Sequence, residues 1–241
     1  HQMLRDNMLI YEKISNWYDL GHINTYFYTR SQITSHRSFN HLSIKDGLVT
    51  KSGIDAKKIL GEGLWFQRIP KQLKKFAPQL IELNSEDAQR ISYTIEYLAL
   101  PPLNEIFVHG KNSVRFWEKA FNECLNFLNT CNLALKEMPV HETNFIKIRQ
   151  HLIVEKTIDR IQRFSVENEY DLDHPVTLNN KPGLSIRRLT EICIACISTL
   201  DVIPGVMHGD FCLSNILFDS RTQSIRVIDP RGINNNGDIS L

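Results

Sequence analysis

The chain reads MHGDFCLSNILF at residues 207–218 and VIDPRG at residues 227–232. An Asp, an Asn five residues later and a second Asp that closes a strand beyond a short hairpin are the polar groups that phosphoryl transfer from ATP requires. We expect Asp210 to be the catalytic residue, which accepts or orients the proton of an attacking hydroxyl. Asn215 and Asp229 carry hard oxygen donors, so they are the expected ligands of a magnesium ion.

Each of these residues has a structural interpretation when it is taken alone. A His-Gly-Asp sequence is a common turn, Asn215 could cap a strand end, and Asp229 could begin a tight turn with Pro230. The joint spacing and the apolar hairpin between the two Asp residues favour an active site. His208 is expected to be structural and to brace the loop through hydrogen bonds from its ring.

On these residues the sequence resembles the aminoglycoside phosphotransferase and choline kinase family of small-molecule kinases, which share the protein-kinase-like fold. His208-Gly209-Asp210 with Asn215 corresponds to the His-Arg-Asp loop of protein kinases, and Asp229-Pro230-Arg231 corresponds to their Asp-Phe-Gly. The sequence IDPRG at residues 228–232 is most similar to the sequences of a subgroup associated with bacterial capsule or surface-polysaccharide genes. The resemblance extends from about Tyr26 to Gly232, and its specific part is the last quarter.

The expected fold class is α+β, a bilobal protein-kinase-like fold. Residues 1–98 would form the N-terminal nucleotide-binding lobe, with residues 1–20 as a leading helix or linker. Residues 99–241 would form a mostly helical catalytic lobe that carries the hairpin. Kinases of this family normally continue into further helices, and the chain opens on His, so we expect it to be a piece of a longer protein, shortened at its C-terminal end.

The pattern of apolar residues agrees with two such halves. Short β-rich runs at residues 26–28, 39–44, 48–50 and 91–98 predict strands, and apolar spacing predicts one helix at 55–68. Helical periodicity follows at 114–135 and 145–164. A polar loop at 167–183 precedes a third helix that Ser185 could cap. Strands are expected again at 216–218 and 224–228.

The resemblance implies nucleotide-binding residues in the first half. Lys51 stands at the strand position that reaches the α- and β-phosphates, and Glu62, on the following helix, is the matching carboxylate. Taken singly, both would be ordinary surface charges. The glycine-free segment 35–40 would cover the phosphates through Arg37 and Ser38. Residues 95–98 would form the hinge, where Glu96, Tyr97 and Leu98 contact adenine, unless they are simply a buried strand.

The acceptor site has two competing predictions. Glu167, Glu169, Asp171 and Asp173 form an acidic run that could hold a cationic acceptor, although such runs are usually solvated. Arg231 could instead contact a phosphate or carboxylate, which would favour an acidic sugar or polyol phosphate. A structural ion pair is the alternative role for Arg231.

Bulk composition excludes several classes of protein. With 28 basic and 27 acidic side chains, a net charge of +1 gives no field that would attract nucleic acid. The longest apolar stretch, residues 192–207, is interrupted by Asp201 and Pro204, so no membrane span is expected. Five cysteines are a sparse and odd set, which favours a reducing, cytoplasmic compartment. Cys193 and Cys196, and likewise Cys124 and Cys131, are expected to be core residues of helices.

Together these features predict an ATP-dependent phosphotransferase that uses Mg²⁺ and phosphorylates an alcohol group of a sugar, polyol or amino alcohol. A role in capsule or surface-polysaccharide assembly, beside or fused to other surface-glycan enzymes, follows from the subgroup resemblance. A catalytically silent kinase-like binding module is the main alternative. A protein kinase is less favoured, because Gly209 replaces the loop arginine and residues 229–232 leave no room for an activation segment.

Overall fold

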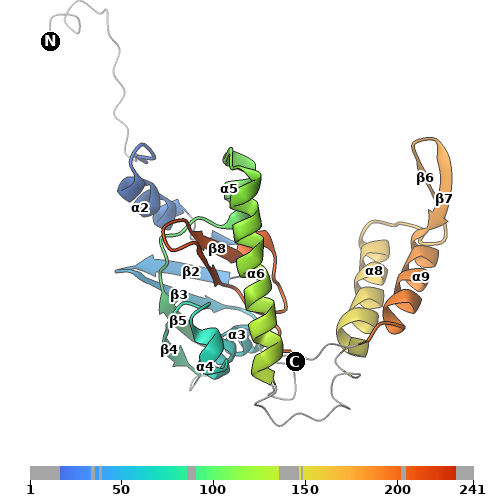
Figure 1. The fold of residues 1–241 in the computed structure, drawn as a ribbon. Coiled ribbons are helices and arrows are strands. Elements are labelled where there is room, and N and C mark those ends of the chain that lie inside the picture. The colour runs from blue at the N-terminus through green and yellow to red at the C-terminus, as the bar shows by residue number, and fades with distance from the viewer. Residues whose placement is uncertain are drawn as a thin grey trace, which may run out of the picture.

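The computed structural model describes residues 17–33, 36–37, 40–85, 91–135, 147, 149–201 and 205–231. Its first half is a five-stranded antiparallel sheet in the order β1-β2-β3-β5-β4. The strands are β1 (His36–Arg37), β2 (Asn40–Lys45), β3 (Leu48–Gly53), β4 (Leu80–Asn84) and β5 (Ser92–Glu96). Figure 1 shows this sheet beside the long helix α6 (Val114–Leu135). The expected α+β architecture with an antiparallel N-terminal sheet is confirmed.

The turn between β2 and β3 sets the register of the sheet. Asp46 and Gly47 both have positive φ, 52° and 76°, as a tight hairpin turn requires. This turn pairs Leu42 with Lys51, and β5 continues the ladder by pairing Lys51 with Tyr93. The ladder therefore places Lys51 in a central strand with Tyr93 opposite it.

Helix α3 (Ala56–Arg68) packs on this sheet. It begins where the Asp55 carboxylate accepts the Lys58 N–H at 3.1 Å, a normal helix cap. A Cβ atom on Gly63 would lie 2.5 Å from Leu83 Cδ1 and 3.2 Å from Tyr93 Cβ, so the helix packs closely on the sheet at this glycine. The buried face of the helix carries Glu62 and Trp65 toward the centre of the molecule.

A single core joins the sheet to the catalytic hairpin. The hairpin consists of β8 (Ile216–Asp219) and β9 (Ser224–Val227), and the short helix α4 (Lys71–Lys74) and helix α5 (Leu103–His109) lie near it. The Val227 N–H donates to the Phe76 carbonyl at 2.6 Å, and the Phe218 N–H donates to the Pro101 carbonyl at 3.0 Å. The largest fully buried side chains of this core include Trp65, Phe66, Leu73, Phe127 and Ile225.

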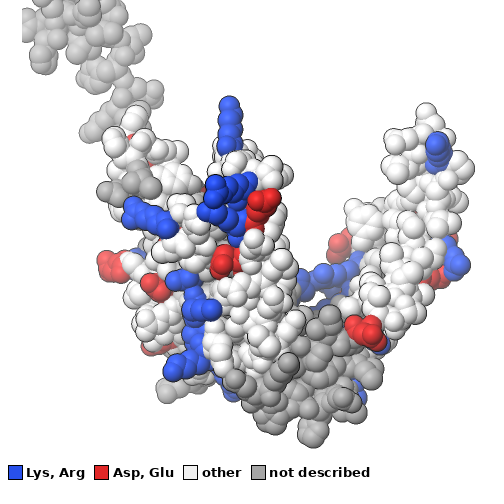
Figure 2. Space-filling view, viewed as in Figure 1, with Lys and Arg blue, Asp and Glu red and all other residues white. Residues whose placement is uncertain are grey.

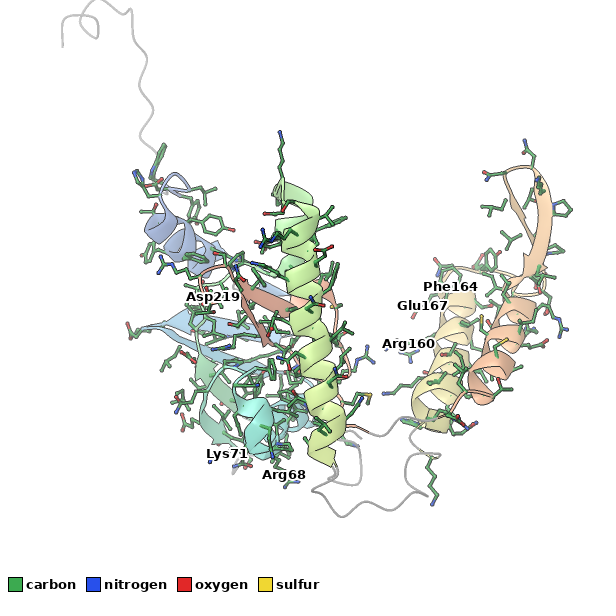
Figure 3. The ribbon with its side chains drawn as sticks, viewed as in Figure 1. Arg68, Lys71, Arg160, Phe164, Glu167 and Asp219 are labelled. Atoms are coloured by element: carbon green, nitrogen blue, oxygen red, sulfur yellow. The ribbon has the colours of Figure 1, made fainter. Side chains whose placement is uncertain are left out.

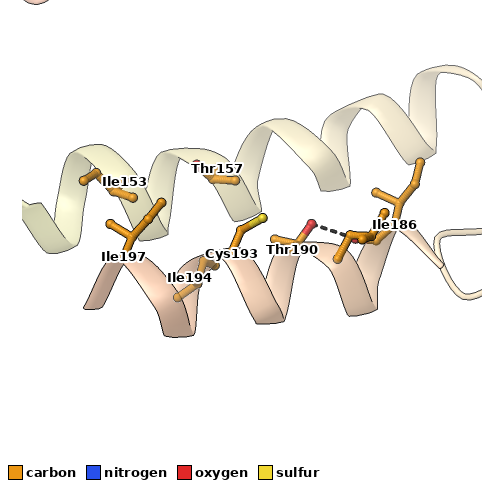
Figure 4. A pocket seen from close by; sticks show the side chains of 8 residues that line it. Ile153, Thr157, Ile186, Thr190, Cys193, Ile194 and Ile197 are labelled. Carbon is orange, nitrogen blue, oxygen red and sulfur yellow. Dashed lines mark hydrogen bonds between the residues drawn. The ribbon is translucent and has the colours of Figure 1, made fainter. Parts of the chain in front are cut away.

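The remaining elements form a helical pair with its own small hairpin, set off from α6 in Figure 1. A π-helical segment (Gln150–Glu155) leads into α8 (Lys156–Glu167), and β6 (Pro175–Leu178) and β7 (Lys181–Ser185) precede α9 (Ile186–Ser198). The predicted cap is confirmed, because Ser185 Oγ accepts the Arg188 N–H at 3.2 Å. Neither α8 nor α9 has a buried residue. An apolar cavity of about 240 Å³ lies between them, lined by Ile153, Cys193 and Ile197 among others (Figure 4).

Two predictions of secondary structure are wrong. Residues 26–28 are not a strand but part of helix α2 (Ile23–Ile33), because helical spacing puts Tyr26 and Arg30 on one face, where both bind the Glu105 carboxylate. The predicted loop at 167–183 contains the β6–β7 hairpin. Asn179 and Asn180 have φ of 51° and 60°, the left-handed pair of a tight turn, which the polar composition concealed.

Cysteine burial was predicted correctly in α6 and wrongly in α9. Cys124 and Cys131 are buried, whereas Cys193 and Cys196 are exposed and lie on a helix without a buried residue. Helical spacing predicts that one stripe of α6 carries Trp117, Phe121, Cys124, Leu128, Cys131 and Leu135, and the buried stripe differs from it. The buried stripe runs through Ala120, Phe127 and Ala134, and it leaves Phe121 and Leu128 exposed. Among the described residues, no helix has the length and apolarity needed to cross a lipid bilayer.

Candidate active site

Lys51 lies between two carboxylates that come from opposite ends of the chain. Its Nζ donates to Glu62 Oε2 at 2.6 Å and also to Asp229 Oδ1. Lys51 and Glu62 are buried, with 6% and 0% of their surfaces exposed, while the side chain of Asp229 is 35% exposed. The predicted pairing of Lys51 with Glu62 is therefore present, and the ammonium also reaches the predicted metal ligand.

The protonation of this group follows from burial and charge together. Burial lowers the pKa of Lys51, but the two carboxylates outweigh it and the net pKa is raised. Burial raises the pKa of Glu62, and Lys51 only partly offsets this effect. The lysine therefore stays positively charged, as a group that binds phosphate oxygens must.

Tyr93 is a further member of this network. Its hydroxyl donates to Glu62 Oε2 at 2.9 Å, on the same oxygen that receives Lys51. Burial, followed by the charge of Glu62, raises the pKa of Tyr93 well above its ordinary value, so it remains a donor. The other oxygen, Glu62 Oε1, has no hydrogen-bond partner among the described groups and lies 3.9 Å from Lys58 Nζ.

Hydrogen bonds join the loop of residues 207–215, which carries Asp210, to the segment that carries Asp229. Asn215 Nδ2 donates to the Asp210 carbonyl at 3.0 Å, and the Ile228 N–H donates to the Asn215 carbonyl at 3.0 Å. The Arg231 N–H donates to the His208 carbonyl at 2.8 Å. These bonds fix the segment of Asp210 and Asn215 and the segment of Asp229 relative to each other. Asp210 is half-buried, so its side chain is accessible.

Two residues in this frame have left-handed backbone conformations. Gly209 has φ of 79°, and a Cβ atom there would lie 2.7 Å from Arg231 Cβ. Asp229 has φ of 59°, which is uncommon for a residue with a side chain. Such conformations cluster at functional sites. Here the left-handed conformation occurs at the residue whose carboxylate contacts Lys51.

His208 is held by rings rather than by the hydrogen bonds that we expected. It is 3% exposed, and neither ring nitrogen has a hydrogen-bond partner among the described groups. The ring meets Trp65 edge-on with centroids 5.5 Å apart, and Phe127 and Phe211 lie at 6.4 and 6.1 Å. Burial lowers the pKa of His208 to about 4, although backbone groups of Ile228 and Asp210 lie near enough to raise it slightly. The residue is therefore neutral and structural.

Asn215 and Asp229, the predicted metal ligands, each carry an oxygen atom of the kind that magnesium prefers. The Asn215 amide nitrogen binds the Asp210 carbonyl, which assigns its remaining polar atom as the oxygen. No cluster of three or more His, Cys, Asp or Glu side chains that could hold a metal occurs among the described residues. Mg²⁺ needs no such cluster, because one or two protein oxygens suffice when phosphate oxygens and water complete the octahedron.

The predicted hinge, residues 95–98, begins at the end of strand β5. The Glu96 N–H donates to the Gln79 carbonyl at 2.9 Å, and the Tyr97 N–H donates to the Gly47 carbonyl at 2.8 Å. These two N–H groups are therefore already bonded to carbonyls of the N-terminal half. Contact with adenine would have to come from other groups of residues 96–98. Arg37 lies in β1, but its side chain is outside the described part of the chain, as is the whole of Ser38.

Sequence reasoning missed Tyr93 and Trp65. Trp65 Nε1 donates to the Met207 carbonyl at 3.0 Å and so joins α3 to the catalytic loop. One signal was available for each: Trp65 lies three residues after Glu62 on the same helical face, and Tyr93 alternates with Ile91 and Ile95 in a predicted strand. The partner atoms themselves could not be deduced from spacing.

Comparisons with known proteins gave matches only among solved structures: no family model and no curated protein matches the chain. One similar structure is an aminoglycoside-3'-phosphotransferase of type VIII, with 17% identity, a TM-score of 0.40, and 82% of this chain and 68% of the other covered. Another is an aminoglycoside phosphotransferase from Streptomyces rimosus, with 13% identity, a TM-score of 0.39, and 86% and 76% covered. Both belong to the family that the motif residues resemble.

Proposed function

We propose that this chain is a phosphotransferase that uses ATP and Mg²⁺ to phosphorylate an alcohol group of a small molecule. The observation that supports this most is the position of Lys51 between Glu62 and Asp229, which are 11 and 178 residues away in the chain. A buried ammonium beside a half-exposed carboxylate is the pairing that a triphosphate with a bound metal requires.

The residues would divide the work as follows. Lys51, oriented by Glu62, binds phosphate oxygens of the nucleotide. Asn215 and Asp229 would hold Mg²⁺, which when bound neutralises charge on the phosphates. Asp210 orients the acceptor hydroxyl and takes its proton as the new oxygen–phosphorus bond forms and the bond from the γ-phosphorus to ADP breaks.

The class of the acceptor and the biological context are also part of this proposal. A sugar, polyol or amino alcohol is the proposed acceptor class, and a place in capsule or surface-polysaccharide assembly in the cytoplasm is the proposed context. All five cysteines are free thiols, which supports a reducing compartment. The acceptor and the context rest on the motif residues and not on the site geometry.

Titration with ATP in the presence and absence of Mg²⁺ tests the nucleotide site. We expect Lys51→Met to weaken ATP·Mg²⁺ binding by about tenfold or more, because it removes a charged hydrogen-bond donor. Since that change also removes the nearest positive charge from the buried Glu62 carboxylate, Asp229→Asn is measured beside it. Asp229→Asn should mainly abolish the dependence of ATP affinity on Mg²⁺. Arg188→Gln, a change on the surface of α9, is the control.

Three results would decide against the proposal. Absence of ATP binding by the parent chain would remove the nucleotide site. Magnesium-dependent ATP binding without phosphorylation of any sugar, polyol, choline or ethanolamine would favour the catalytically silent module. Labelling of protein substrates alone would favour a protein kinase.

A further inference from the structure

Helix α2 is joined to helix α5 by an ion pair between residues that are 75 positions apart in the chain. Arg30 Nη1 donates to Glu105 Oε2 at 2.8 Å, and Arg30 Nη2 donates to Glu105 Oε1 at 2.7 Å. The Tyr26 hydroxyl donates to the same Oε2 at 3.3 Å. Two parallel hydrogen bonds between a guanidinium and a carboxylate fix orientation as well as distance. We call Tyr26, Arg30 and Glu105 the α2–α5 clamp.

The clamp is less exposed to water than an ion pair on the outer surface of the molecule. The side chains of Arg30 and Glu105 are 26% and 34% exposed, whereas those of the Arg188–Glu191 pair on α9 are 62% and 55% exposed. In Figure 2, acidic and basic side chains lie intermingled over the sheet and α6, without a large field of one sign. Because water screens a half-buried bidentate pair less, this pair can stabilise one arrangement of α2 and α5.

On one side the clamp is connected to the sheet that carries Lys51. Helix α2 contacts β2, and β2 is paired with β3, where Lys51 lies. Thr29 is 3% exposed, and its Oγ1 donates to the Asp19 carbonyl at 2.9 Å, which fixes the start of α2 against the segment before it. Helix α2 therefore belongs to the same half of the molecule as the predicted phosphate-binding lysine.

On the other side the clamp is connected to the catalytic hairpin. Helix α5 contacts β8 and the short 3₁₀-helix Leu213–Asn215, which carries a predicted metal ligand. Leu103, the first residue of α5, is fully buried. Just before α5, the Pro101 carbonyl accepts the Phe218 N–H at 3.0 Å. A displacement of α5 would therefore move the 3₁₀-helix relative to Lys51.

The predicted hinge lies between these two connections. At its N-terminal end the Tyr97 N–H donates to the Gly47 carbonyl in the sheet, and after its C-terminal end Pro101 is bonded to the hairpin. The clamp thus joins the two sides of the hinge a second time, through side chains. Burial raises the pKa of Tyr97 and the charge of Arg30 lowers it in part, which agrees with a position of the hinge close to the clamp.

We propose that Arg30 and Glu105 are positioning residues for the nucleotide site. They hold α2 to α5 across the predicted hinge, and so they keep Lys51 and the turn at Asn215 in the arrangement that binds a nucleotide with Mg²⁺. This role rests on the proposed phosphotransferase function. A site that is in its binding-competent arrangement for only a fraction of the time binds more weakly by that fraction. Loss of the clamp should therefore weaken nucleotide binding although no group that touches the nucleotide is removed.

Calorimetric titration with ADP·Mg²⁺ tests this role in Arg30→Gln, in Glu105→Gln and in the double variant. We expect each single variant to bind ADP·Mg²⁺ about three- to tenfold more weakly than the parent. The double variant should lose no more than either single variant, because the two side chains act as one unit. Urea unfolding at the titration temperature establishes that each variant is folded during the measurement.

Arg163→Gln is the matched control, because it breaks an arginine–carboxylate pair, with Asp159, on another helix. That helix is α8, which Figure 3 shows apart from the sheet and α6, with Arg160 and Phe164 labelled on it. Its affinity for ADP·Mg²⁺ should stay within about twofold of the parent.

Hydrogen exchange without nucleotide tests the clamp independently of the proposed function. The Phe218 N–H, which is bonded to Pro101, should exchange at least about threefold faster in Arg30→Gln than in the parent, and at the parental rate in Arg163→Gln. Failure of the parent to bind ADP·Mg²⁺ would count against the phosphotransferase, whereas this exchange measurement would still decide whether the clamp holds α5 and the hairpin in place.

Three outcomes would overturn the proposal. ADP·Mg²⁺ affinities within about twofold of the parent in both single variants would leave the clamp a contact that contributes to stability alone. Additive losses in the double variant would show that Arg30 and Glu105 act separately. Unchanged exchange of the Phe218 N–H in Arg30→Gln would show that α5 does not transmit the effect of the clamp to the hairpin.

Discussion

The indole of Trp65 donates to the carbonyl of Met207 at 3.0 Å, so helix α3 is hydrogen-bonded directly to the residue that precedes His208. The same helix carries Glu62, which orients Lys51. Since Trp65 is fully buried, the Glu62 carboxylate and the loop that carries Asp210 are held by one rigid element. A change at Trp65 should therefore affect both.

Trp65→Phe removes this hydrogen bond and part of the ring. We expect the free energy of unfolding to fall by about 2 to 4 kcal/mol, from the unsatisfied carbonyl and the cavity together. Urea unfolding measures the loss. Trp17→Phe is the control, because Trp17 is 78% exposed. Equal losses in the two variants would contradict a structural role for the Trp65 bond.

Tyr93→Phe removes one hydroxyl from the network around Glu62 and keeps the ring that packs against Phe66. The buried carboxylate loses a donor, so its pKa should rise further and stability at neutral pH should fall by about 1 to 3 kcal/mol. ATP·Mg²⁺ affinity should fall less than in Lys51→Met. Tyr18→Phe, at an exposed position, provides the comparison. Identical unfolding curves for Tyr93→Phe and the parent would rule out this contribution.

The neutral, buried His208 predicts a dependence of stability on pH. Its pKa is lowered from 6.5 to about 4 in the folded protein, so the unfolded chain binds the proton more tightly. The stability difference is absent above about pH 7 and grows as the pH falls from about 6.5 toward 4. Between pH 7.5 and 4.5 the loss should be roughly 2 to 3 kcal/mol.

His208→Phe isolates this effect, because the ring contacts are retained and the ring nitrogens form no hydrogen bonds with described groups. Urea unfolding at several pH values should show a smaller loss of stability on acidification in the variant than in the parent. A parent and a variant with parallel pH profiles would show that His208 is not the titrating group.

Asp210→Asn should lower kcat by about 10² to 10⁴ and leave ADP·Mg²⁺ affinity unchanged, because only the acceptance of a proton is lost. Steady-state kinetics with an acceptor that the parent chain phosphorylates, together with ADP titration, separate the two effects. Asp201→Asn, at an exposed position, should match the parent. Turnover by Asp210→Asn at the parental rate would exclude the proposed role.

Local signals explain which elements could be predicted. The Ser185 cap and the hairpin after Asn215 depend on neighbouring residues, and the structure contains both of them. Helix α2 was mistaken for a strand because its stability depends on Glu105, far away in the chain. The β6–β7 hairpin was missed because an Asn-Asn turn resembles any polar loop.

The sequence alone determined the chemical inventory: the spacing of Asp210, Asn215 and Asp229, and the order in which Lys51 and Glu62 precede them, can be read without coordinates. Only the tertiary structure decided that Lys51 reaches Asp229 and that Tyr93 completes the network. The reason is physical, because contacts between residues so distant along the chain depend on how the sheet, α3 and the hairpin pack and not on local spacing.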